Sequence, residues 1–285
     1  MSVVSPLLTV RGMARRQLSI TIGSSLVALV ALTALVSFVW TPSDPHAIDS
    51  DHTLLGPGAS GHLLGTDRFG RDVLSQLMVG ARLTLLIGMV AVVIAAVIGI
   101  PLGLVAGLRA KSWVSELILR SIDVLFGFPA LLLAILLAAS YGASITTAMI
   151  AIGVATIPSF VRITYAGSLQ VMALDYITAA RASGLRSVAL ARRHVIPNIA
   201  SLLLVQASVA FALSILAEAG LSYLSLSSDP STPSWGRMLR DSQTFLYSAP
   251  TLAIWPGLAI ALSVLGFNLL GDGLRDRFDP KQRQR

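Results

Sequence analysis

Long apolar runs dominate this sequence and decide what it can fold into. Each run spans about 20 residues, the length at which a helix crosses the ~30 Å hydrocarbon layer of a membrane, whereas soluble cores use shorter segments. Charged residues make up only 12% of the 285, about half of the usual share in a soluble domain. We therefore predict an all-α polytopic membrane protein with six transmembrane helices. The predicted spans cover residues 18–40, 83–108, 122–141, 145–166, 199–221 and 252–270.

The distribution of Lys and Arg predicts the orientation of these spans. With the N-terminus inside, the inner segments hold about three times as many Lys and Arg as the outer ones, as the positive-inside rule requires. Trp40 suits an aromatic anchor at the outer end of an uncleaved first span. The sequence therefore predicts a multi-pass protein of the cytoplasmic (inner) membrane with both termini in the cytoplasm. The basic residues nearest the termini are Arg11, Arg15, Arg16, Lys281, Arg283 and Arg285.

One inner loop, residues 168–198, is long enough to carry a function of its own. Asp175 is a candidate N-cap, good helix formers follow it over 177–183, and Gly184 breaks the helix. A second helix then leads to Pro197, which suits the start of the next span. From periodicity alone, a basic helix lying on anionic lipid is an equally good interpretation.

The residues of this loop favour a more specific interpretation. Thr178-Ala179-Ala180, then Gly184, then Ile196-Pro197 resemble the EAA motif of ABC importer permeases, although Thr178 stands where that family usually has Glu. The resemblance implies a coupling helix over about residues 175–186 that sits in a groove of an ATPase. The implied coupling residues are Tyr176, Thr178, Ala179, Ala180, Arg181, Gly184, Leu185 and Pro197.

Three longer stretches, residues 62–88, 120–135 and 232–280, resemble the C-type permease subunit of the dipeptide, oligopeptide and nickel branch of these importers. The resemblance implies a type I ABC importer permease core in a domain of five transmembrane helices over 61–285, after an N-terminal part, 1–60, that holds a tail, the first span and the start of an outer loop. It also implies a homologous permease as a heterodimer partner, two ATPase domains that hold ATP and Mg, and an extracytoplasmic substrate-binding protein. Short peptides are the expected cargo, with nickel or another small solute as the alternative.

Two outer segments are candidates for contact with that binding protein or for an outer gate. Residues 72–81 are amphipathic and predict a helix lying at the outer surface. Pro233, Trp235 and Gly236 predict a rigid turn, in which we prefer a membrane-interface anchor as the role of the indole ring. The candidate contact residues are Arg71, Asp72, Trp235 and Arg237.

Ionisable residues inside the spans are few, which argues against a secondary transporter coupled to an ion gradient. Asp123 lies three residues after Arg120, so we expect a local ion pair. Glu218 lies near the outer end of its span, where snorkelling or pairing across the bundle is expected.

Several other function classes find no support in the sequence. A net charge of +7 suggests nucleic acid, but the basic residues punctuate apolar spans instead of gathering on one soluble face. The chain has no phosphate-binding loop of the G-x4-G-K-[ST] type, so we predict a non-enzymatic subunit that binds no cofactor or metal itself. Three His in the first outer loop are interpreted as solvated residues.

A membrane anchor or receptor without transport activity remains a third hypothesis.

Overall fold

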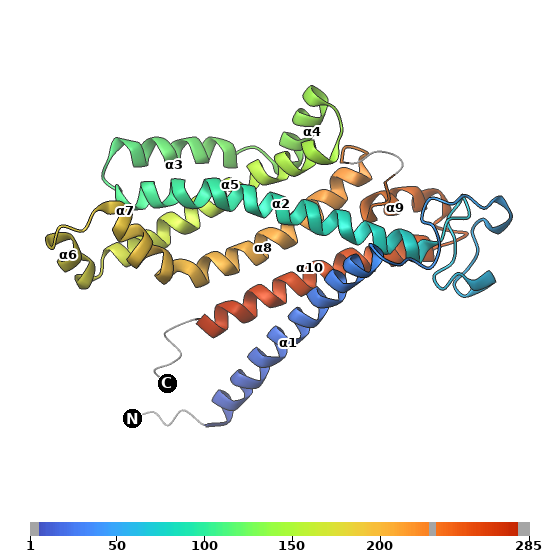
Figure 1. Ribbon diagram of the computed structural model, residues 1–285, viewed down its shortest axis with the longest axis horizontal. Helices are drawn as coiled ribbons and strands as arrows, with labels where there is room; N and C mark the ends of the chain where they lie inside the picture. The colour runs from blue at the N-terminus through green and yellow to red at the C-terminus, as the bar shows by residue number, and fades with distance from the viewer. Residues whose placement is uncertain (1–5, 228–231, 279–285) are drawn as a thin grey trace.

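The computed structural model describes residues 6–227 and 232–278, with side chains from residue 18 onward. Within these residues nearly all regular structure is helical, which confirms the predicted all-α class (Figure 1). Long helices run side by side as a bundle, and short helices gather at its two ends. The long helices are α1 (Pro6–Ser37), α2 (Val73–Leu108), α5 (Ile145–Met172), α8 (Ile196–Tyr223) and α10 (Thr251–Phe278).

Shorter elements connect the long helices. They are α3 (Trp113–Phe126), α4 (Ala130–Tyr141), α6 (Asp175–Ala182), α7 (Ser187–Leu190) and α9 (Trp235–Ser242). A π-helical segment, Ala191–Val195, joins α7 to α8, and 3₁₀ turns lie at Ser50–His52, Ala59–Gly61 and Gln243–Phe245. Because α5 extends to Met172, the inner loop of the structure comprises residues 173–198. We call residues 41–72, together with α9 and the last 3₁₀ turn, the outer cap. The inner loop and the outer cap occupy opposite ends of the bundle in Figure 1.

Five helices in the described residues are long and apolar enough to cross a membrane, and α3 with α4 would make a sixth span. These two helices meet at a bend of 82°, so the segment predicted as one span over 122–141 is sharply kinked, as the Pro within it indicates. The physical reason is Pro129, which lacks an N–H group and disfavours helical backbone at the residue before it. Gly127 and Phe128 therefore end α3, and α4 turns away from the bundle in Figure 1.

Small residues bring α2 and α5 into direct backbone contact. A Cβ atom at Gly99 would lie 2.6 Å from the Cβ of Phe160, and one at Gly103 would lie 2.6 Å from the Cβ of Thr164. Gly107 lies against Ser168 in the same way. Close approach of this kind stabilises helix pairs in lipid, where burial of apolar surface gives no drive. The close contacts predicted from the glycines within the second span are thus confirmed.

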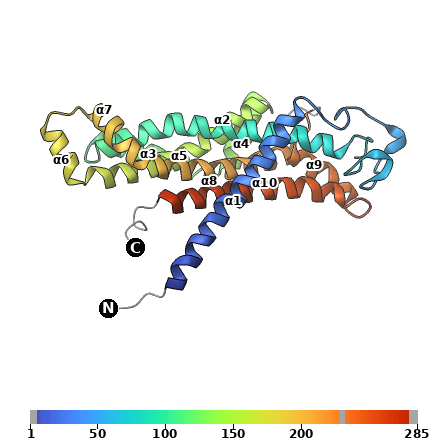
Figure 2. The same ribbon diagram turned by 60° about the horizontal axis from the view of Figure 1, so that its bottom comes forward.

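The first helix packs antiparallel to the last. Gly23 of α1 lies against the backbone of Leu270, and Gly266 of α10 lies against Leu26. Figures 1 and 2 show that the start of α1 and the end of α10 point toward the end of the bundle that carries α6. The side chains of Arg11, Arg15 and Arg16 and all of Lys281, Arg283 and Arg285 lie outside the described residues, so the orientation remains a prediction.

Two expected charge interactions differ from the structure. Arg120 contacts Glu116 on its own helix at 2.5 Å, while the carboxylate of Asp123 accepts a hydrogen bond of 2.7 Å from Arg162 on α5. The predicted Arg120–Asp123 pair is therefore wrong, because Asp123 pairs with a residue of another helix and Arg120 with a different carboxylate.

Glu218 is fully buried and does not snorkel. Its carboxylate accepts hydrogen bonds from Ser222, at 2.7 Å, and across the bundle from Thr84 on α2, at 3.3 Å. The alternative of pairing across the bundle is thus confirmed, and this carboxylate holds α8 to α2 near the outer cap.

Candidate functional site

The inner loop presents α6 as a short, sharply ended helix. The prediction that Asp175 is the N-cap is wrong, because Asp175 is the first residue of the helix. Leu174 is the N-cap, with extended backbone and no side-chain hydrogen bond to the helix. The carboxylate of Asp175 still lies in the first turn, where a negative charge favours the helix dipole. At the other end, the N–H of Leu185 donates to the carbonyl of Ala180 and the N–H of Gly184 to that of Arg181. Gly184 has φ +84°, so the helix ends in a Schellman motif.

A single apolar side chain anchors α6 to the bundle. Ile177 is 0% exposed and packs in a cluster formed by the inner ends of α2, α5 and α8. Burying such a side chain stabilises by roughly 1.5–3 kcal/mol. Because α6 makes few other contacts with the bundle, a force on α6 acts on the three long helices through this cluster. Its buried members are Leu104, Val171, Ile177, Leu190, Val195 and Ile199.

The opposite face of α6 is open. Of the predicted coupling residues, six are exposed, while Ala180 and Leu185 are half-buried against the apolar cluster. Nothing lies within 4 Å of the position of a Cβ at Gly184. The exposed predicted residues are Tyr176, Thr178, Ala179, Arg181, Gly184 and Pro197.

Two residues that the sequence did not single out position Tyr176. The side-chain amide of Asn198 donates to the Tyr176 hydroxyl at 3.2 Å and to the carbonyl of His194 at 2.6 Å. The imidazole of His194 lies 5.8 Å from the Tyr176 ring, between centroids. Asn198 follows Tyr176 by 22 residues, and no local sequence pattern predicts this contact.

Basic side chains surround the inner loop. A depression of about 610 Å³ beside α7 is lined by Arg186, Arg192 and Arg193, and one of about 520 Å³ lies between Lys111 and Arg181. The described surface at this end of the bundle is thus electropositive and suits a partner with acidic groups, or anionic lipid.

The outer cap is organised around the N-terminus of α2. Asp72 is 2% exposed, and its carboxylate accepts hydrogen bonds of 2.7 Å from the backbone N–H and the hydroxyl of Ser75. Its other oxygen contacts the Nδ1 of His62 at 2.9 Å. Asp72 is therefore the N-cap residue of α2, and its carboxylate is buried within the outer cap. Arg71 pairs with Asp67 at 2.7 Å.

The prediction of a helix lying at the outer surface over residues 72–81 is wrong. This segment is the first part of α2, which runs unbroken from Val73 to Leu108. Val73 and Met78 are buried, and so is Gln76, whose amide donates to Asp67 at 3.0 Å. The apolar stripe reflects packing beneath the cap, because residues of α9 pack against this part of α2.

Trp235 is also buried, at 2% exposed, so the predicted membrane-interface anchor is wrong for this ring. Its indole N–H donates to the carbonyl of Leu77 at 3.0 Å, and its ring lies against Gly80. Ser234 N-caps α9 by accepting from the N–H of Arg237, so Trp235 and Gly236 form a helical turn in place of the predicted rigid loop. Gly236 contacts the backbone of Ala219 on α8.

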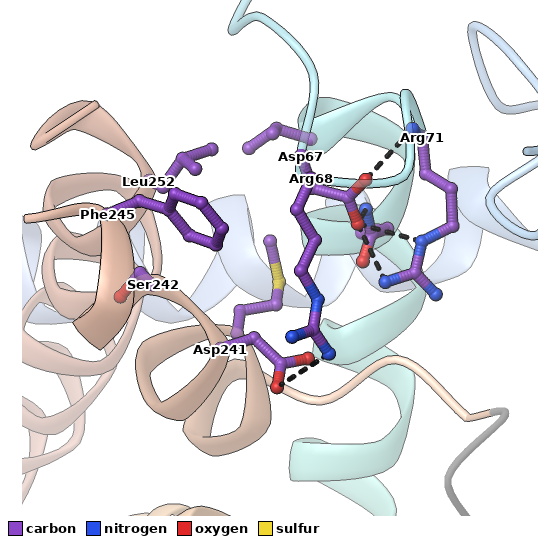
Figure 3. Close-up of a pocket in the computed structure, with 10 residues that line it drawn as sticks. Asp67, Arg68, Arg71, Asp241, Ser242, Phe245 and Leu252 are labelled. Carbon is purple, nitrogen blue, oxygen red and sulfur yellow. Dashed lines mark hydrogen bonds and ion pairs between the residues drawn. The ribbon is translucent and has the colours of Figure 1, made fainter. Parts of the chain in front are cut away.

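Arginines gather where α9 faces the N-terminus of α5. A depression of about 670 Å³ there is lined by Arg68, Arg237 and Arg240, and by residues 143–146. Arg68 and Arg237 each lie 3.7 Å from Asp241, and Figure 3 shows the Arg68–Asp241 and Arg71–Asp67 pairs around a neighbouring small cavity. Burial, together with the nearby arginines, lowers the pKa of Arg237, although Asp241 opposes this shift. The depression is therefore electropositive.

Comparison with known proteins identifies the family. Residues 99–284 match the model of the binding-protein-dependent transport system inner membrane component. The chain belongs to this family. This permease is 38% identical to the dipeptide transport system permease protein DppC of Alkalihalophilus pseudofirmus, over 92% of this chain and 86% of that protein. It is 40% identical to DppC of Escherichia coli, over 95% of this chain and 91% of the relative.

A second group of relatives carries another name. The permease is 37% identical to the glutathione transport system permease protein GsiD of Pectobacterium atrosepticum, over 94% of this chain and 88% of that protein. Among solved structures it resembles the inward-facing MetNI methionine ABC transporter, with a TM-score of 0.60 and 17% identity over 71% of this chain and 96% of that chain. At that identity the likeness shows the fold alone, which is that of an ABC importer permease. The predicted family and fold are thus confirmed.

Proposed function

We propose that this permease is one membrane subunit of an ATP-driven importer that carries short peptides across the cytoplasmic membrane. The observation that supports the proposal most is the similarity, over about nine-tenths of the chain, to permeases named for dipeptides and for glutathione. Both solutes are short peptides with free carboxylate and ammonium groups. Nickel, the alternative cargo, is an outcome of the transport test below.

The exposed face of α6 is the proposed docking surface for an ATPase. The predicted coupling residues Tyr176, Ala179 and Gly184 lie exposed on or just after this helix, and the open space at Gly184 leaves room for a partner's surface. Two ATPase domains would hold ATP and Mg²⁺, and the permease supplies only the mechanical contact. The Arg-lined depression beside α7 would receive acidic side chains of the ATPase.

The proposed alternating access uses the packing of Ile177 of α6 against the bundle. When the ATPase domains close on ATP, they would pull α6, and the Ile177 cluster would pass that movement to α2, α5 and α8 together. The helices would rock as a body and open the pathway outward, and hydrolysis would reset them. Both termini would lie in the cytoplasm, on the side of α6.

The remaining partners complete the proposal. A homologous permease would form a heterodimer with residues 61–285, leaving residues 1–60 as an added N-terminal part. The electropositive depression at Arg68, Arg237 and Arg240 would receive an acidic surface of the extracytoplasmic binding protein. Arg71 lines the neighbouring small cavity and would act through Asp67. Asp72 and Trp235 would support the same contact by holding the outer cap in shape.

Uptake of a labelled dipeptide into proteoliposomes tests the proposed function. The co-purified complex should take up dipeptide only with both ATP and binding protein. In the Gly184→Trp variant uptake should fall at least tenfold while the complex still assembles, because the indole would occupy the space that the partner needs. Gly184→Ala is the matched control: it introduces the backbone strain of φ +84° without the bulk, and should retain most of the uptake.

Four outcomes would overturn the proposal or one part of it. Uptake driven by an imposed ion gradient without ATP would identify a secondary transporter. An assembled complex with no flux of any solute would identify a receptor or anchor. ATP-driven uptake of Ni²⁺ but not of dipeptide would move the cargo to the alternative. Loss of lipid binding, with coupling unchanged, in Gly184→Trp would favour the interfacial-helix interpretation of the inner loop.

A further inference from the structure

The break between α3 and α4 exposes backbone polar groups along a membrane-crossing segment. Pro129 precedes α4 without a side-chain cap, and the first backbone hydrogen bond runs from the N–H of Leu133 to its carbonyl. The N–H groups of residues 130–132 therefore point out of the helix end without an intrahelical acceptor. In hydrocarbon such groups are costly, and irregular backbone occurs at membrane depth only where it is buried in protein or lines a water-filled cavity.

An exposed ion pair lies beside this break. A guanidinium nitrogen of Arg162 is 2.7 Å from a carboxylate oxygen of Asp123, and the two side chains are 48% and 63% exposed. The guanidinium also lies 4.3 Å from the ring centre of Phe126. Phe126 and Phe128 are themselves more than half exposed. One face of α3 and α5 thus combines both signs of charge with two aromatic rings.

The positions of these residues along their helices place the pair within the candidate membrane spans. Ser168 packs against Gly107, so it is level with the inner end of the apolar run of α2. Arg162 lies six residues outward from Ser168, or roughly 9 Å along the helix axis. Asp123 lies ten residues outward from Trp113, the first residue of α3, or roughly 15 Å. Both charges therefore lie within helices that are long and apolar enough, alone or as a bent pair, to cross the ~30 Å hydrocarbon layer.

Lipid cannot surround this pair at low cost. Ionisable residues inside membranes face a bundle interior or a water-filled cavity, and there they mark the paths of substrates. Along α2 and residues 199–221 of α8, by contrast, the exposed side chains are apolar, as at Val97 and Leu213. Three independent features, the broken helix, the exposed charges and the exposed rings, therefore coincide on one face that does not suit lipid.

We propose that the face formed by Asp123, Phe126, Phe128 and Arg162 lines the aqueous translocation pathway, where Arg162 and Asp123 act as counter-charges for the carboxylate and the ammonium of a zwitterionic peptide. This inference rests on the proposed peptide cargo. An exposed ion pair contributes little net stability, so it can separate and exchange its partners for the charges of the solute. The aromatic rings would contact the side chains of the peptide without selecting among them.

Cysteine labelling tests the pathway without relying on transport, because the chain contains no Cys. Single Phe128→Cys and Leu213→Cys variants have similarly exposed positions on the two faces. In the assembled complex in membranes, a charged methanethiosulfonate reagent should modify the Phe128→Cys thiol at least tenfold faster than the Leu213→Cys thiol. Equal, slow modification at both positions would overturn the inference, because it would place the break in lipid or in a closed interface with another subunit.

Uptake by an Arg162→Gln variant tests the assigned ligand chemistry. We expect uptake of a dipeptide to fall at least fivefold relative to wild type, and uptake of the same dipeptide with an amidated C-terminus to fall less than twofold. Comparing each solute with its own wild-type rate removes differences in delivery by the binding protein. Equal losses for both solutes, or none, would overturn the counter-charge role. If wild type imports no peptide at all, the proposed function fails, while the labelling result still judges the pathway.

Discussion

The outer cap and the inner loop both contain short helices, but they use their polar side chains in different ways. In the cap, Asp72 and Trp235 are almost fully buried, and each is hydrogen-bonded to another segment, Asp72 to His62 and Trp235 to Leu77. In the inner loop, α6 begins without a side-chain cap and is held to the bundle through Ile177. The cap buries and hydrogen-bonds these two side chains, whereas α6 leaves most of its side chains exposed.

This difference indicates which end of the permease holds its shape by its own contacts. A buried network of satisfied hydrogen bonds fixes one arrangement of the chain, so the cap serves as a rigid frame around the outer ends of α2 and α8. An exposed helix with one apolar anchor gains further contacts only from another molecule. The inner loop is therefore the part of the structure that is suited to receive motion from a partner.

Removing the anchor of α6 should have the largest effect. Ile177→Ala deletes a fully buried side chain, a change that typically costs about 2–5 kcal/mol. We expect amide hydrogen exchange across residues 174–190 to accelerate at least tenfold, and peptide uptake to fall with it. The control is Val188→Ala, because Val188 is exposed on α7. Unchanged exchange in Ile177→Ala would show that α6 has another attachment.

A collision within the cap should have the next largest effect. A Cβ at Gly236 would overlap the backbone of Ala219, so Gly236→Ala should destabilise by about 1–3 kcal/mol through overpacking. The measurement is the thermal unfolding midpoint in detergent. At Gly257 on α10 the nearest atom to a new Cβ is 3.9 Å away, so Gly257→Ala should leave the midpoint unchanged or higher. Equal midpoints for the two variants would contradict a tightly packed cap.

Paired substitutions of Asp72 and Asp175 sharpen the comparison of the two helix starts. Asp72 is a bonded N-cap, so Asp72→Ala should cost about 0.5–2 kcal/mol. Asp175 only lies near a helix dipole, so Asp175→Ala should cost less, about 0.3–1 kcal/mol. Thermal midpoints in the same detergent give the order, and a larger loss for Asp175→Ala would refute the assignment of the caps.

The smallest expected effect is a pH dependence at the exposed edge of the cap. The imidazole of His52 donates a hydrogen bond from Nδ1 to the carboxylate of Asp49, and this contact raises the pKa of His52 and lowers the pKa of Asp49. The raised His52 pKa contributes stability that is fully present below its unfolded value of about 6.5 and is lost as pH rises through the folded value. The thermal midpoint of wild type should exceed that of His52→Gln slightly near pH 5.5, and the difference should vanish by about pH 8.5. A constant difference over this range would exclude the pair.

Sequence patterns predicted the spans and the inner loop because apolar length and backbone breakers act locally. The stop at Gly184 and the start near Pro197 both follow from such local rules. The bend at Pro129 is a local effect too, but its size of 82° depends on what α4 packs against.

Contacts between distant segments account for the parts that the sequence did not predict. Asp123 lies near Arg120 in sequence but pairs with Arg162, 39 residues away. The indole of Trp235 reaches a carbonyl 158 residues earlier, which turned a predicted surface ring into a buried one. The Asn198–Tyr176 contact likewise depends on how the inner loop folds back on α8.

Hydrogen exchange on the permease with and without its ATPase tests the central claim most directly. The account predicts that ATPase binding slows exchange at residues 174–190 at least tenfold and leaves residues 49–80 and 232–245 of the outer end unchanged. Protection confined to the outer cap, or no protection at the inner loop in an assembled complex, would contradict the assignment of α6 as the docking surface.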